Sequence, residues 1–425
     1  MPKGVAVTHR NLAVYTSAIL DRLAAGQQTQ FAAVSDISTD LGNTAIFPAL
    51  SSGGCIHLID PEMSIDGAAL AAYAEDHPLD VIKITPTHLR VLLRGGDGFL
   101  PRRWLVVGGE PLSWDLVERI RATGATCRIL NHYGPTEATV GCCTLEVPSR
   151  RDSRSAATVP IGRPLAGAHA YILDEQLEPV PVGVDGELCI AGAGVARGYV
   201  NRSEETAERF LADGLGQAGG RIYRTGDRAR FLRDGAIAFL GRVDDQVKIR
   251  GFRVEPSEIE ATILRHPAVR EAAVVAREEG EADLGLVAYL VASPEPTLSE
   301  LRSFLGRSLP EHMMPSRFVA IDALPLTSSG KVDRRALPDP RTIHSRSADY
   351  VAPRDELEQQ IADIWCQLLR VDEVGVLDDF FSLGGHSLLA TQAIMRIRRL
   401  HGNIPLGALF NSPTVAALAE VIRAS

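Results

Sequence analysis

The sequence GRVDDQVKIRGFRVEPSE, residues 241–258, decides how the rest of the chain is interpreted. Asp244 opens a pair of carboxylates that follows a Gly-Arg turn. The alternating residues 246–250 predict a short strand with one buried face. Gly251 ends that strand, and the Pro-Ser pair at 256–257, with acidic residues after it, predicts the first turn of a helix. A polar hairpin of any α/β protein would also satisfy this pattern, so its meaning depends on the motifs around it.

The composition predicts a soluble, globular chain with several cores. The chain has 425 residues, of which 45% are hydrophobic and 23% are charged, and its net charge is -9. This length leaves room for about two to four domains. The acidic balance argues against a nucleic-acid surface. No signal peptide is visible, and no apolar run reaches the roughly 18 residues that a membrane helix needs, so we expect neither nucleic acid nor membrane as a partner.

The six cysteines have no CxxC or Cys/His metal spacing. Scattered thiols of this kind are typical of proteins in a reducing compartment. We therefore expect a cytoplasmic protein in which each thiol is buried for structural reasons.

Other motifs flank residues 241–258 in a definite order. They are NHYGPTEATVGCC at 131–143, YRTGDRAR at 223–230 and LPLTSSGKVDRRAL at 324–337. Together they resemble the adenylate-forming enzymes, the superfamily of acyl-CoA ligases, luciferases and peptide-synthetase adenylation domains. In that family a large core holds ATP and an acid, and a small C-terminal lobe swings about a hinge between two half-reactions. The resemblance places the hinge at Asp244.

The resemblance implies a multi-domain chain with an α/β adenylate-forming core, a small α+β C-terminal lobe and an all-α four-helix carrier domain. We expect the core at residues 1–243, the mobile lobe at 244–338, a polar linker at 339–353 and the carrier at 354–425. The Pro-Lys-Gly at the start of the chain resembles only the tail of the family's phosphate-binding loop. The core is therefore expected to be truncated at its front, with Lys3 as a frayed terminal residue.

A nucleotide site follows from the same resemblance. In the family the matching side chains read and stack the adenine, contact phosphate, hydrogen-bond the ribose hydroxyls and hold Mg²⁺, which neutralises charge on the triphosphate. The predicted residues are Asn131, Tyr133, Thr136, Asp227 and Arg242 for the nucleotide, and Glu137 for the metal. Without the flanking motifs, Tyr-Gly-Pro-Thr-Glu would be an ordinary turn into a capped helix, and Asp227 would be a turn cap.

The family's specificity positions imply an amino-acid pocket that resembles those selecting aspartate. Asp40 would hold the α-ammonium group, because an unpaired buried ammonium is costly. Lys83 and His132 would bring positive charge and donors to a short side-chain carboxylate. Asparagine and β-hydroxyaspartate are the competing substrates. The full predicted set is Asp40, Leu41, Thr44, Lys83, Val106, Gly108, His132, Val140 and Gly141.

These pocket residues also have ordinary structural interpretations. Judged alone, Asp40 would more often be a helix N-cap. A strand lysine such as Lys83 is more often a solvated charge, and His132 would be a packed imidazole. The two glycines, Gly108 and Gly141, are expected to leave room in the pocket.

Lys331, in the Ser-Ser-Gly-Lys turn of the lobe, is the predicted catalytic residue. In the family this lysine bridges the acid carboxylate and the α-phosphate while the adenylate forms, and its charge offsets the anionic transition state. A lysine in such a turn would otherwise be solvent-exposed.

The end of the chain contains a separate motif, LGGHSL at residues 383–388. It resembles the phosphopantetheine attachment site of carrier proteins. The resemblance implies that a phosphopantetheinyl transferase attaches 4'-phosphopantetheine to Ser387, which would otherwise be a plain helix N-cap.

The motifs together resemble a nonribosomal peptide synthetase segment, an adenylation region followed by a peptidyl carrier. Such a segment activates an amino acid, here L-aspartate, with ATP and loads it as a thioester on the phosphopantetheine arm. Condensation and other synthetase domains are the expected partners. Two alternatives remain: an acyl-CoA ligase-like enzyme, which Asp40 and the fused carrier oppose, and a non-catalytic carrier and assembly platform.

Overall fold

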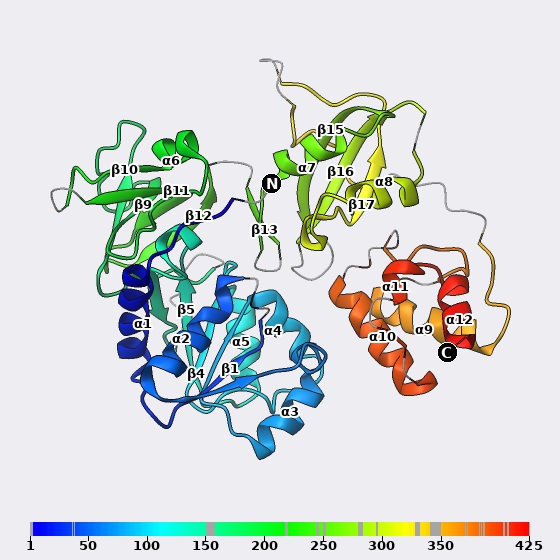
Figure 1. Cartoon of the computed structure of the whole chain (residues 1–425), viewed down its shortest axis with the longest axis horizontal. Helices are drawn as coiled ribbons and strands as arrows, with labels where there is room; N and C mark the ends of the chain where they lie inside the picture. The colour runs from blue at the N-terminus through cyan, green and yellow to red at the C-terminus, as the bar shows by residue number, and fades with distance from the viewer. Residues whose placement is uncertain are drawn as a thin grey trace. The chain divides into compact units, whose positions relative to one another are not determined.

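The computed structural model describes residues 3–424, apart from 36, 38, 150–157, 217–219, 244–245, 250–251, 279–283, 295, 328–331, 341–349, 370, 372, 382, 384, 386, 403 and 406–407. The chain divides into two compact units, Met1–Phe252 and Arg253–Ser425, whose elements are labelled in Figure 1. The predicted hinge residue Asp244 and the predicted catalytic Lys331 lie outside the described residues. The expected boundaries at 243, 338 and 353 stay predictions.

A seven-stranded sheet organises the first half of the first unit, with the order β2-β1-β3-β4-β5-β6-β7. The pairings among β1 to β5 are parallel, and β6 and β7 add antiparallel edges. β3 and β4 are buried along their whole length, as expected for strands covered on both faces. The bounds are β1 (Gln30–Ala33), β2 (Cys55–Leu58), β3 (Val81–Ile84), β4 (Trp104–Gly108), β5 (Arg128–Tyr133), β6 (Cys143–Glu146) and β7 (Arg163–Pro164).

Different helices cover the two faces of this sheet, because successive strand residues point to opposite sides. On one face Ile82 and Leu105 pack with α3 (Gly67–Asp76), α4 (Pro86–Leu92) and α5 (Trp114–Ala122). On the other face Val81 and Val106 pack with α1 (His9–Leu23) and α2 (Asn43–Ser52). Short 3-10 turns lie at η1 (Asp40–Gly42), η2 (Met63–Ile65) and η3 (Thr136–Ala138).

The apolar spacing predicts one amphipathic helix over residues 5–25 with Thr8 as a candidate N-cap; α1 is shorter than this segment, and Thr8 is its N-cap. Thr8 caps α1 in a capping box with Asn11, and the residues before it pair with a distant segment instead: the Ala6 N–H donates to the carbonyl of Gly198 at 2.9 Å. Lys3 forms an ion pair with Glu205 at 3.2 Å, so the expectation of a frayed lysine is wrong.

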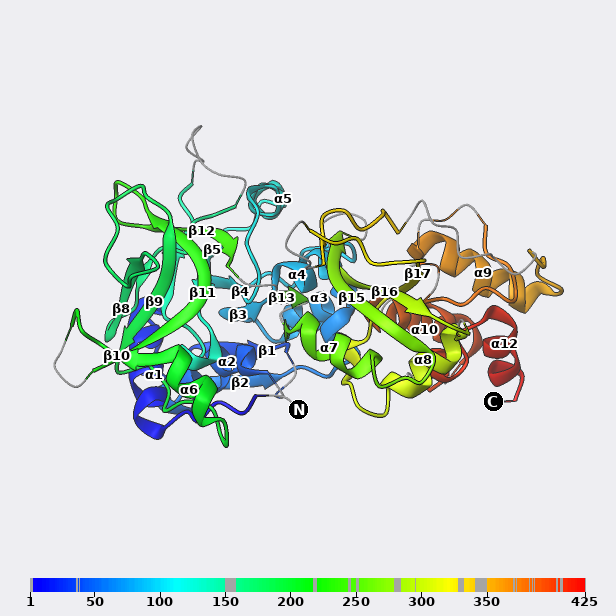
Figure 2. The ribbon, with the colours of Figure 1, turned by 90° about the horizontal axis from the view of Figure 1, so that it is seen from above.

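An antiparallel sheet with the order β10-β11-β9-β8, and β12 on β11, forms the rest of the first unit. Figure 2 shows its long strands β9 and β11 side by side. Its elements are β8 (Ala168–Leu173), β9 (Gly186–Gly192), α6 (Ser203–Arg209), β10 (Phe210–Ala212), β11 (Arg221–Phe231) and β12 (Ile237–Arg242), after which comes β13 (Val247–Ile249).

The second unit begins with a small α+β layer, as the sequence predicts. Its sheet has the order β15-β16-β17, with β15 and β16 antiparallel and β16 and β17 parallel. Its elements are β14 (Phe252–Val254), α7 (Pro256–Ile263), β15 (Val269–Glu278), β16 (Leu284–Ala292), α8 (Leu298–Leu305), η4 (Glu311–Met313) and β17 (Arg317–Ala320). The pattern of residues 255–338 predicts a helix, two strands and a second helix, and the structure has these as α7, β15, β16 and α8.

Four helices follow, and the predicted all-α fold of this part is confirmed. They are α9 (Glu356–Leu369), α10 (Ser387–His401), α11 (Ala408–Asn411) and α12 (Val415–Arg423). Trp365 and Phe380, both fully buried, lie at the centre of their core with ring centroids 4.8 Å apart. The apolar spacing in α9 gives it the face that buries Ile361, Trp365 and Leu368.

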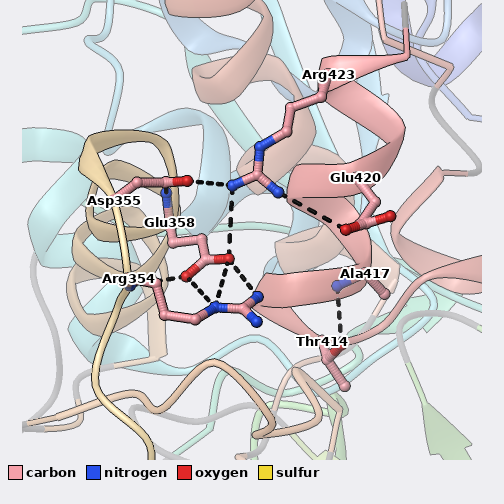
Figure 3. A network of polar contacts seen from close by, with 7 residues as sticks. All are labelled: Arg354, Asp355, Glu358, Thr414, Ala417, Glu420 and Arg423. Atoms are coloured by element: carbon pink, nitrogen blue, oxygen red, sulfur yellow. Dashed lines mark hydrogen bonds and ion pairs between the residues drawn. The ribbon is translucent and has the colours of Figure 1, made fainter.

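A network of charges joins the start of α9 to the end of α12 (Figure 3). Glu358 is 0% exposed, and its Oε1 accepts a hydrogen bond from Nη2 of Arg354 at 2.5 Å. Arg423 lies 3.6 Å from the same carboxylate and also pairs with Asp355. The hydrogen bonds from Arg354 are the main cause that lowers the pKa of Glu358 to about 2. This buried carboxylate therefore links two helices that are far apart in sequence.

Among the described residues, no helix is long and apolar enough to cross a membrane. All six cysteines are free thiols, of which Cys142, Cys143 and Cys189 are buried. Cys55 is exposed, so the expectation that every thiol is buried is wrong for this residue.

Candidate active site

A row of hydrogen-bonded polar side chains lies between the seven-stranded sheet and the helices α1 and α2 that cover this face. Strand alternation places Lys83 of β3 and His132 of β5 on this face, where they are 2% and 3% exposed. Nζ of Lys83 lies 3.0 Å from Nδ1 of His132. On the other side of the imidazole, Nε2 lies 3.2 Å from the hydroxyl of Tyr15, and that hydroxyl lies 2.7 Å from Oγ1 of Thr44. The burial of Lys83 excludes a solvated strand lysine.

Burial is the main cause that sets the charges of these side chains. Burial lowers the pKa of Lys83 to about 7, while the charge of Asp40 raises this pKa and the charge of Lys248 lowers it further. Burial, and then the charge of Lys83, holds the pKa of His132 well below its usual value. Burial also raises the pKa of Tyr15 above its ordinary range. At neutral pH the histidine is therefore uncharged, the tyrosine is protonated and the lysine titrates.

Two glycines make room for these side chains. A Cβ atom at Gly108 would lie 2.5 Å from Nζ of Lys83 and 2.1 Å from the carbonyl oxygen of His132. At Gly141 a Cβ atom would lie 2.0 Å from Cε1 and 2.2 Å from Nε2 of His132. Any larger residue at either position would displace the imidazole or the ammonium group.

Asp40 is the first residue of η1, at the entry to α2. Thr39 is the N-cap of η1 and Gly42 is the N-cap of α2, so the alternative interpretation of Asp40 as a helix N-cap is wrong. Burial raises its pKa, against a hydrogen bond with Thr136 and the nearby lysine charges, which lower it. Its Oδ2 atom is buried and has no hydrogen-bond partner among the described residues. An orphaned buried carboxylate oxygen fits an ammonium group.

The remaining predicted pocket residues lie near this face. Thr44 and Val106 are fully buried, Val140 is 8% exposed and packs in the same apolar cluster as Val106, and Leu41 is half-buried in η1. Val140 has a φ of 63°, a left-handed conformation that is strained for a β-branched side chain. This turn places the next residue, Gly141, beside the imidazole of His132.

A second group of predicted residues meets where the last residues of β5 and β12 lie beside the middle of β11. Asp227 and Arg242 are register partners in β11 and β12, and Nη1 of Arg242 donates to Oδ1 of Asp227 at 2.5 Å. The hydroxyl of Tyr133 donates to the other carboxylate oxygen. Asp227 is 3% exposed, so the alternative of an exposed turn cap is excluded. The structure thus brings together three of the five residues predicted to bind nucleotide.

Glu137, the predicted metal ligand, lies in η3 and is 1% exposed. Its Oε1 accepts a hydrogen bond from the hydroxyl of Tyr199 at 2.6 Å. Its neighbour Thr136 is exposed. Within the described ranges no group of three or more His, Cys, Asp and Glu side chains gathers in a way that would hold a metal ion. A single carboxylate fits Mg²⁺ of the kind that takes its other ligands from phosphates and water.

Asn131 points to the opposite face from His132 and is 3% exposed. Its amide nitrogen donates to the carbonyls of Val159 at 3.2 Å and Pro160 at 2.8 Å. The side chain therefore anchors the segment that leads to β7.

Sequence reasoning missed three residues of this region. Tyr15 lies on the apolar face of a predicted helix, where it looked like an ordinary core residue. Tyr199 follows a glycine-rich segment, residues 192–198, whose pattern indicates mainly a structural role. Lys248 lies in the alternating strand β13, with Nζ 5.6 Å from the ring centroid of Tyr133. These residues are recognised only by their partner side chains in the structure. Because those partners are distant in sequence, no local pattern indicates them.

The predicted attachment residue, Ser387, is the first residue of α10. The turn before it approaches the core closely: the Gly385 N–H donates to the carbonyl of Phe380 at 2.9 Å. A Cβ atom at Gly385 would lie 2.2 Å from the Phe380 ring. The glycine therefore lets this turn pack directly on the ring and positions the start of α10.

Comparisons with known proteins agree with this division of the chain. The model of the AMP-binding enzyme family matches residues 1–200, and that of the AMP-binding enzyme C-terminal domain matches residues 258–331. The phosphopantetheine attachment site family matches residues 359–422.

Relatives share this arrangement over the whole chain. Malpinin synthetase of Mortierella alpina is 43% identical over 99% of this chain, and a dimodular nonribosomal peptide synthase of Bacillus subtilis is 40% identical over 98%. The chain spans 6% of the length of the first protein and 17% of the second. The structure of holo-PA1221, a nonribosomal peptide synthetase protein containing adenylation and PCP domains, matches with a TM-score of 0.80 and 30% identity. That match covers 100% of this chain and 70% of the other.

The fold, the site and these matches define an adenylate-forming enzyme region followed by a carrier domain. The chain belongs to the nonribosomal peptide synthetases. Membership of this family brings ATP as the nucleotide of the AMP-binding region and a phosphopantetheine attachment site in the carrier region, and Mg²⁺ is typical of the family.

Proposed function

We propose that this chain activates an amino acid with an acidic side chain, L-aspartate, using MgATP, and loads it as a thioester on phosphopantetheine at Ser387. The observation that supports the substrate is a carboxylate and an ammonium group that lie near each other, Asp40 and Lys83. The orphaned Oδ2 of Asp40 and the Lys83 ammonium are close enough for each charge to alter the pKa of the other group.

The two charges fit the two ends of the substrate. Asp40 accepts the α-ammonium group, which would otherwise be buried without a partner. Lys83 meets the side-chain carboxylate with a charge-assisted hydrogen bond. Asparagine offers Lys83 no charge, so the site favours the acid, while β-hydroxyaspartate carries the same carboxylate and is the second substrate to test. Leu41, Val106 and Val140 supply the apolar walls.

The nucleotide roles follow from the second cluster. Asp227 accepts hydrogen bonds from the ribose hydroxyls on the lone pairs that Arg242 and Tyr133 leave, since each of these two side chains donates to one carboxylate oxygen. Tyr133 stacks on the adenine and Thr136 contacts phosphate. Glu137, held by Tyr199, would bind Mg²⁺, and Asn131 would shape the adenine pocket through its bonds to the segment at 159–160.

In the first half-reaction a carboxylate oxygen of the amino acid attacks the α-phosphorus, and pyrophosphate leaves. Lys331 offsets the charge that develops on the α-phosphate. The lobe of residues 244–338 then turns at Asp244, which lets one pocket serve both half-reactions. Ser387 would carry the phosphopantetheine arm, whose thiol would supply the nucleophile that takes the aminoacyl group as AMP leaves. A phosphopantetheinyl transferase and condensation domains are the partners that this function requires.

The intact mass of the chain tests the proposal directly. The chain is treated with a phosphopantetheinyl transferase and CoA, and then with MgATP and L-aspartate. We expect a pantetheine increment followed by an aspartyl increment, and neither in Ser387→Ala. A pantetheine increment without any aminoacyl increment would instead leave a carrier and assembly platform. Loading of Ser387→Ala would overturn the attachment site.

A further inference from the structure

Lys83 and His132 are neighbours in this site, and both nitrogens of the imidazole have partners inside the protein. Nδ1 of His132 lies 3.0 Å from Nζ of Lys83, and Nε2 lies 3.2 Å from the Tyr15 hydroxyl. A histidine whose two ring nitrogens are engaged in this way has no donor left for a substrate. It therefore acts on the substrate through Lys83.

The direction of each hydrogen bond follows from the charge on Lys83. An ammonium group only donates, so Nδ1 of His132 must accept and the ring proton must be on Nε2. Nε2–H then donates to the oxygen of Tyr15, and the Tyr15 hydroxyl in turn donates to Oγ1 of Thr44, 2.7 Å away. When Lys83 is charged, only these hydrogen-bond directions give both imidazole nitrogens and the Tyr15 hydroxyl a suitable partner.

The ammonium group keeps two donors for a ligand. A lysine ammonium has three N–H groups, and one is directed to His132. Among the described residues the structure gives Lys83 no other hydrogen-bond partner. Two free donors match the two oxygens of one carboxylate.

We propose that Tyr15 is a positioning residue of the substrate site: its hydroxyl oxygen accepts the Nε2–H that a charged Lys83 imposes on His132, and this contact holds the imidazole, and through it the Lys83 ammonium, in place for a substrate carboxylate. The inference rests on the proposed function for the identity of the ligand, but the tautomer itself does not depend on it. Tyr15 belongs to α1 and Thr44 to α2, so the two helices that cover the sheet face also set the protonation of the pocket.

Loss of the Lys83 proton releases this constraint. A neutral amine has a lone pair, so Nδ1–H of His132 then donates to Lys83, and the hydroxyls of Tyr15 and Thr44 turn round. The titratable groups that bear on Lys83 are His132 on β5, Asp40 on η1 and Lys248 on β13. Burial sets the pKa of Lys83 at about 7, so the change of tautomer falls near neutral pH.

The test is the tautomer of His132 in the whole chain without substrate. Histidine rings are labelled with ¹⁵N, two-bond ¹H–¹⁵N correlations are recorded from pH 6 to 9, and the loss of one signal in His132→Gln assigns the residue. In the unmodified chain we expect the Nε2–H form at pH 6 and a growing Nδ1–H fraction above pH 7. Lys83→Met should remove this pH dependence.

The decisive variant is Tyr15→Phe, with Tyr73→Phe as the matched control. The hydroxyl of Tyr73 shares a hydrogen bond with Nδ1 of His57 at 2.8 Å, so its change removes an equivalent hydroxyl from another histidine. In Tyr15→Phe the buried Nε2–H loses its acceptor, which disfavours the form with a charged Lys83, so the Nδ1–H form should appear at a lower pH than in the unmodified chain. Tyr73→Phe should leave the pH dependence of His132 unchanged. A doubly protonated or Nδ1–H ring at pH 6 in the unmodified chain would overturn the proposal, as would an unaltered pH dependence of the tautomer in Tyr15→Phe.

The same variants in a calorimetric titration separate this inference from the proposed function. Tyr15→Phe should weaken L-aspartate binding about tenfold, since a buried donor loses its acceptor, and should change L-asparagine binding much less. If the unmodified chain binds neither amino acid, the proposed substrate is wrong, while the tautomer measurement still decides the role of Tyr15. If Tyr15→Phe does not fold, the unmodified chain and Lys83→Met decide it.

Discussion

Nη1 of Arg242 lies 2.5 Å from Oδ1 of Asp227, its register partner on the neighbouring strand. The two side chains are 12% and 5% exposed, so this ion pair is largely shielded from solvent. The Tyr133 hydroxyl donates to the other carboxylate oxygen. The carboxylate is therefore held in a single orientation before any ligand arrives, which lowers the entropy cost of binding.

This relationship predicts the effect of Asp227→Asn on nucleotide binding. The amide loses the charge that accepts the ribose hydroxyls, and charge-assisted hydrogen bonds contribute roughly 1.5–3 kcal/mol each. We expect AMP to bind at least tenfold more weakly by calorimetry. Asp185→Asn is the control, because Asp185 is an ion-paired carboxylate of the same sheet region that is 35% exposed. Equal AMP affinity in the two variants would refute the role of Asp227.

The titration of Lys83 predicts how substrate choice depends on pH. Its pKa is lowered to about 7, so the side chain is charged below this pH and neutral above it. The affinity for L-aspartate should be highest below pH 7 and should fall by up to about tenfold for each pH unit above it. L-Asparagine needs no charge on Lys83, so its affinity should stay level. Parallel slopes for both amino acids would contradict the pocket assignment, and Lys83→Met should remove the difference between them.

The contact of Gly141 with the imidazole predicts a strong effect of a single methyl group. In Gly141→Ala the new Cβ would meet Cε1 and Nε2 of His132 at 2.0 and 2.2 Å, so the ring must move away from Tyr15 or Lys83. We expect aspartate affinity to fall at least tenfold in the titration, an estimate based on overpacking costs of about 1–3 kcal/mol. Gly26→Ala is the control, because nothing lies within 4 Å of the position that its Cβ would take. A Gly141→Ala chain with unchanged affinity would show that His132 has freedom to move.

The buried carboxylate of the carrier predicts a stability effect. Glu358→Gln removes the charge that Arg354 and Arg423 surround, and should lower the stability of the helices by about 2 kcal/mol. Amide hydrogen exchange in peptides from α9 and α12 measures this loss. Glu356→Gln, at an exposed position of the same helix turn, should exchange like the unmodified chain. Equal protection in both variants would mean that the ion pair contributes nothing.

Glu358 also predicts how the stability of the carrier helices changes at acid pH. The pKa of Glu358 is lowered in the folded chain to about 2, from an ordinary value near 4.5. The contribution of the charged Glu358 to the free energy of unfolding is therefore complete above about pH 4.5 and is lost as the pH falls toward 2. The unmodified chain should lose protection in α9 over this range, while Glu358→Gln should show a smaller change there. An identical acid profile in the two chains would contradict this assignment.

The sequence by itself determined the family, the order of its parts and most of the regular elements. Capping and periodicity are local properties, so Thr8 marks the start of α1 and the apolar spacing of residues 356–369 defines α9. Pairing with a distant segment is not local, which is why the first helix was predicted to begin too early. The individual site roles, and those of Asp244 and Lys331 in particular, stay predictions.

Only the tertiary structure decided which polar groups share a pocket. Lys83 and His132 are 49 residues apart, and Tyr15 and His132 are 117 apart, yet the order β3-β4-β5 and the packing of α1 bring them into one hydrogen-bonded chain. The pKa of a lysine and the tautomer of a histidine depend on burial and on the partner atoms in space. Neither quantity is a property of the residues in isolation, so the sequence alone names the side chains while the fold decides their protonation.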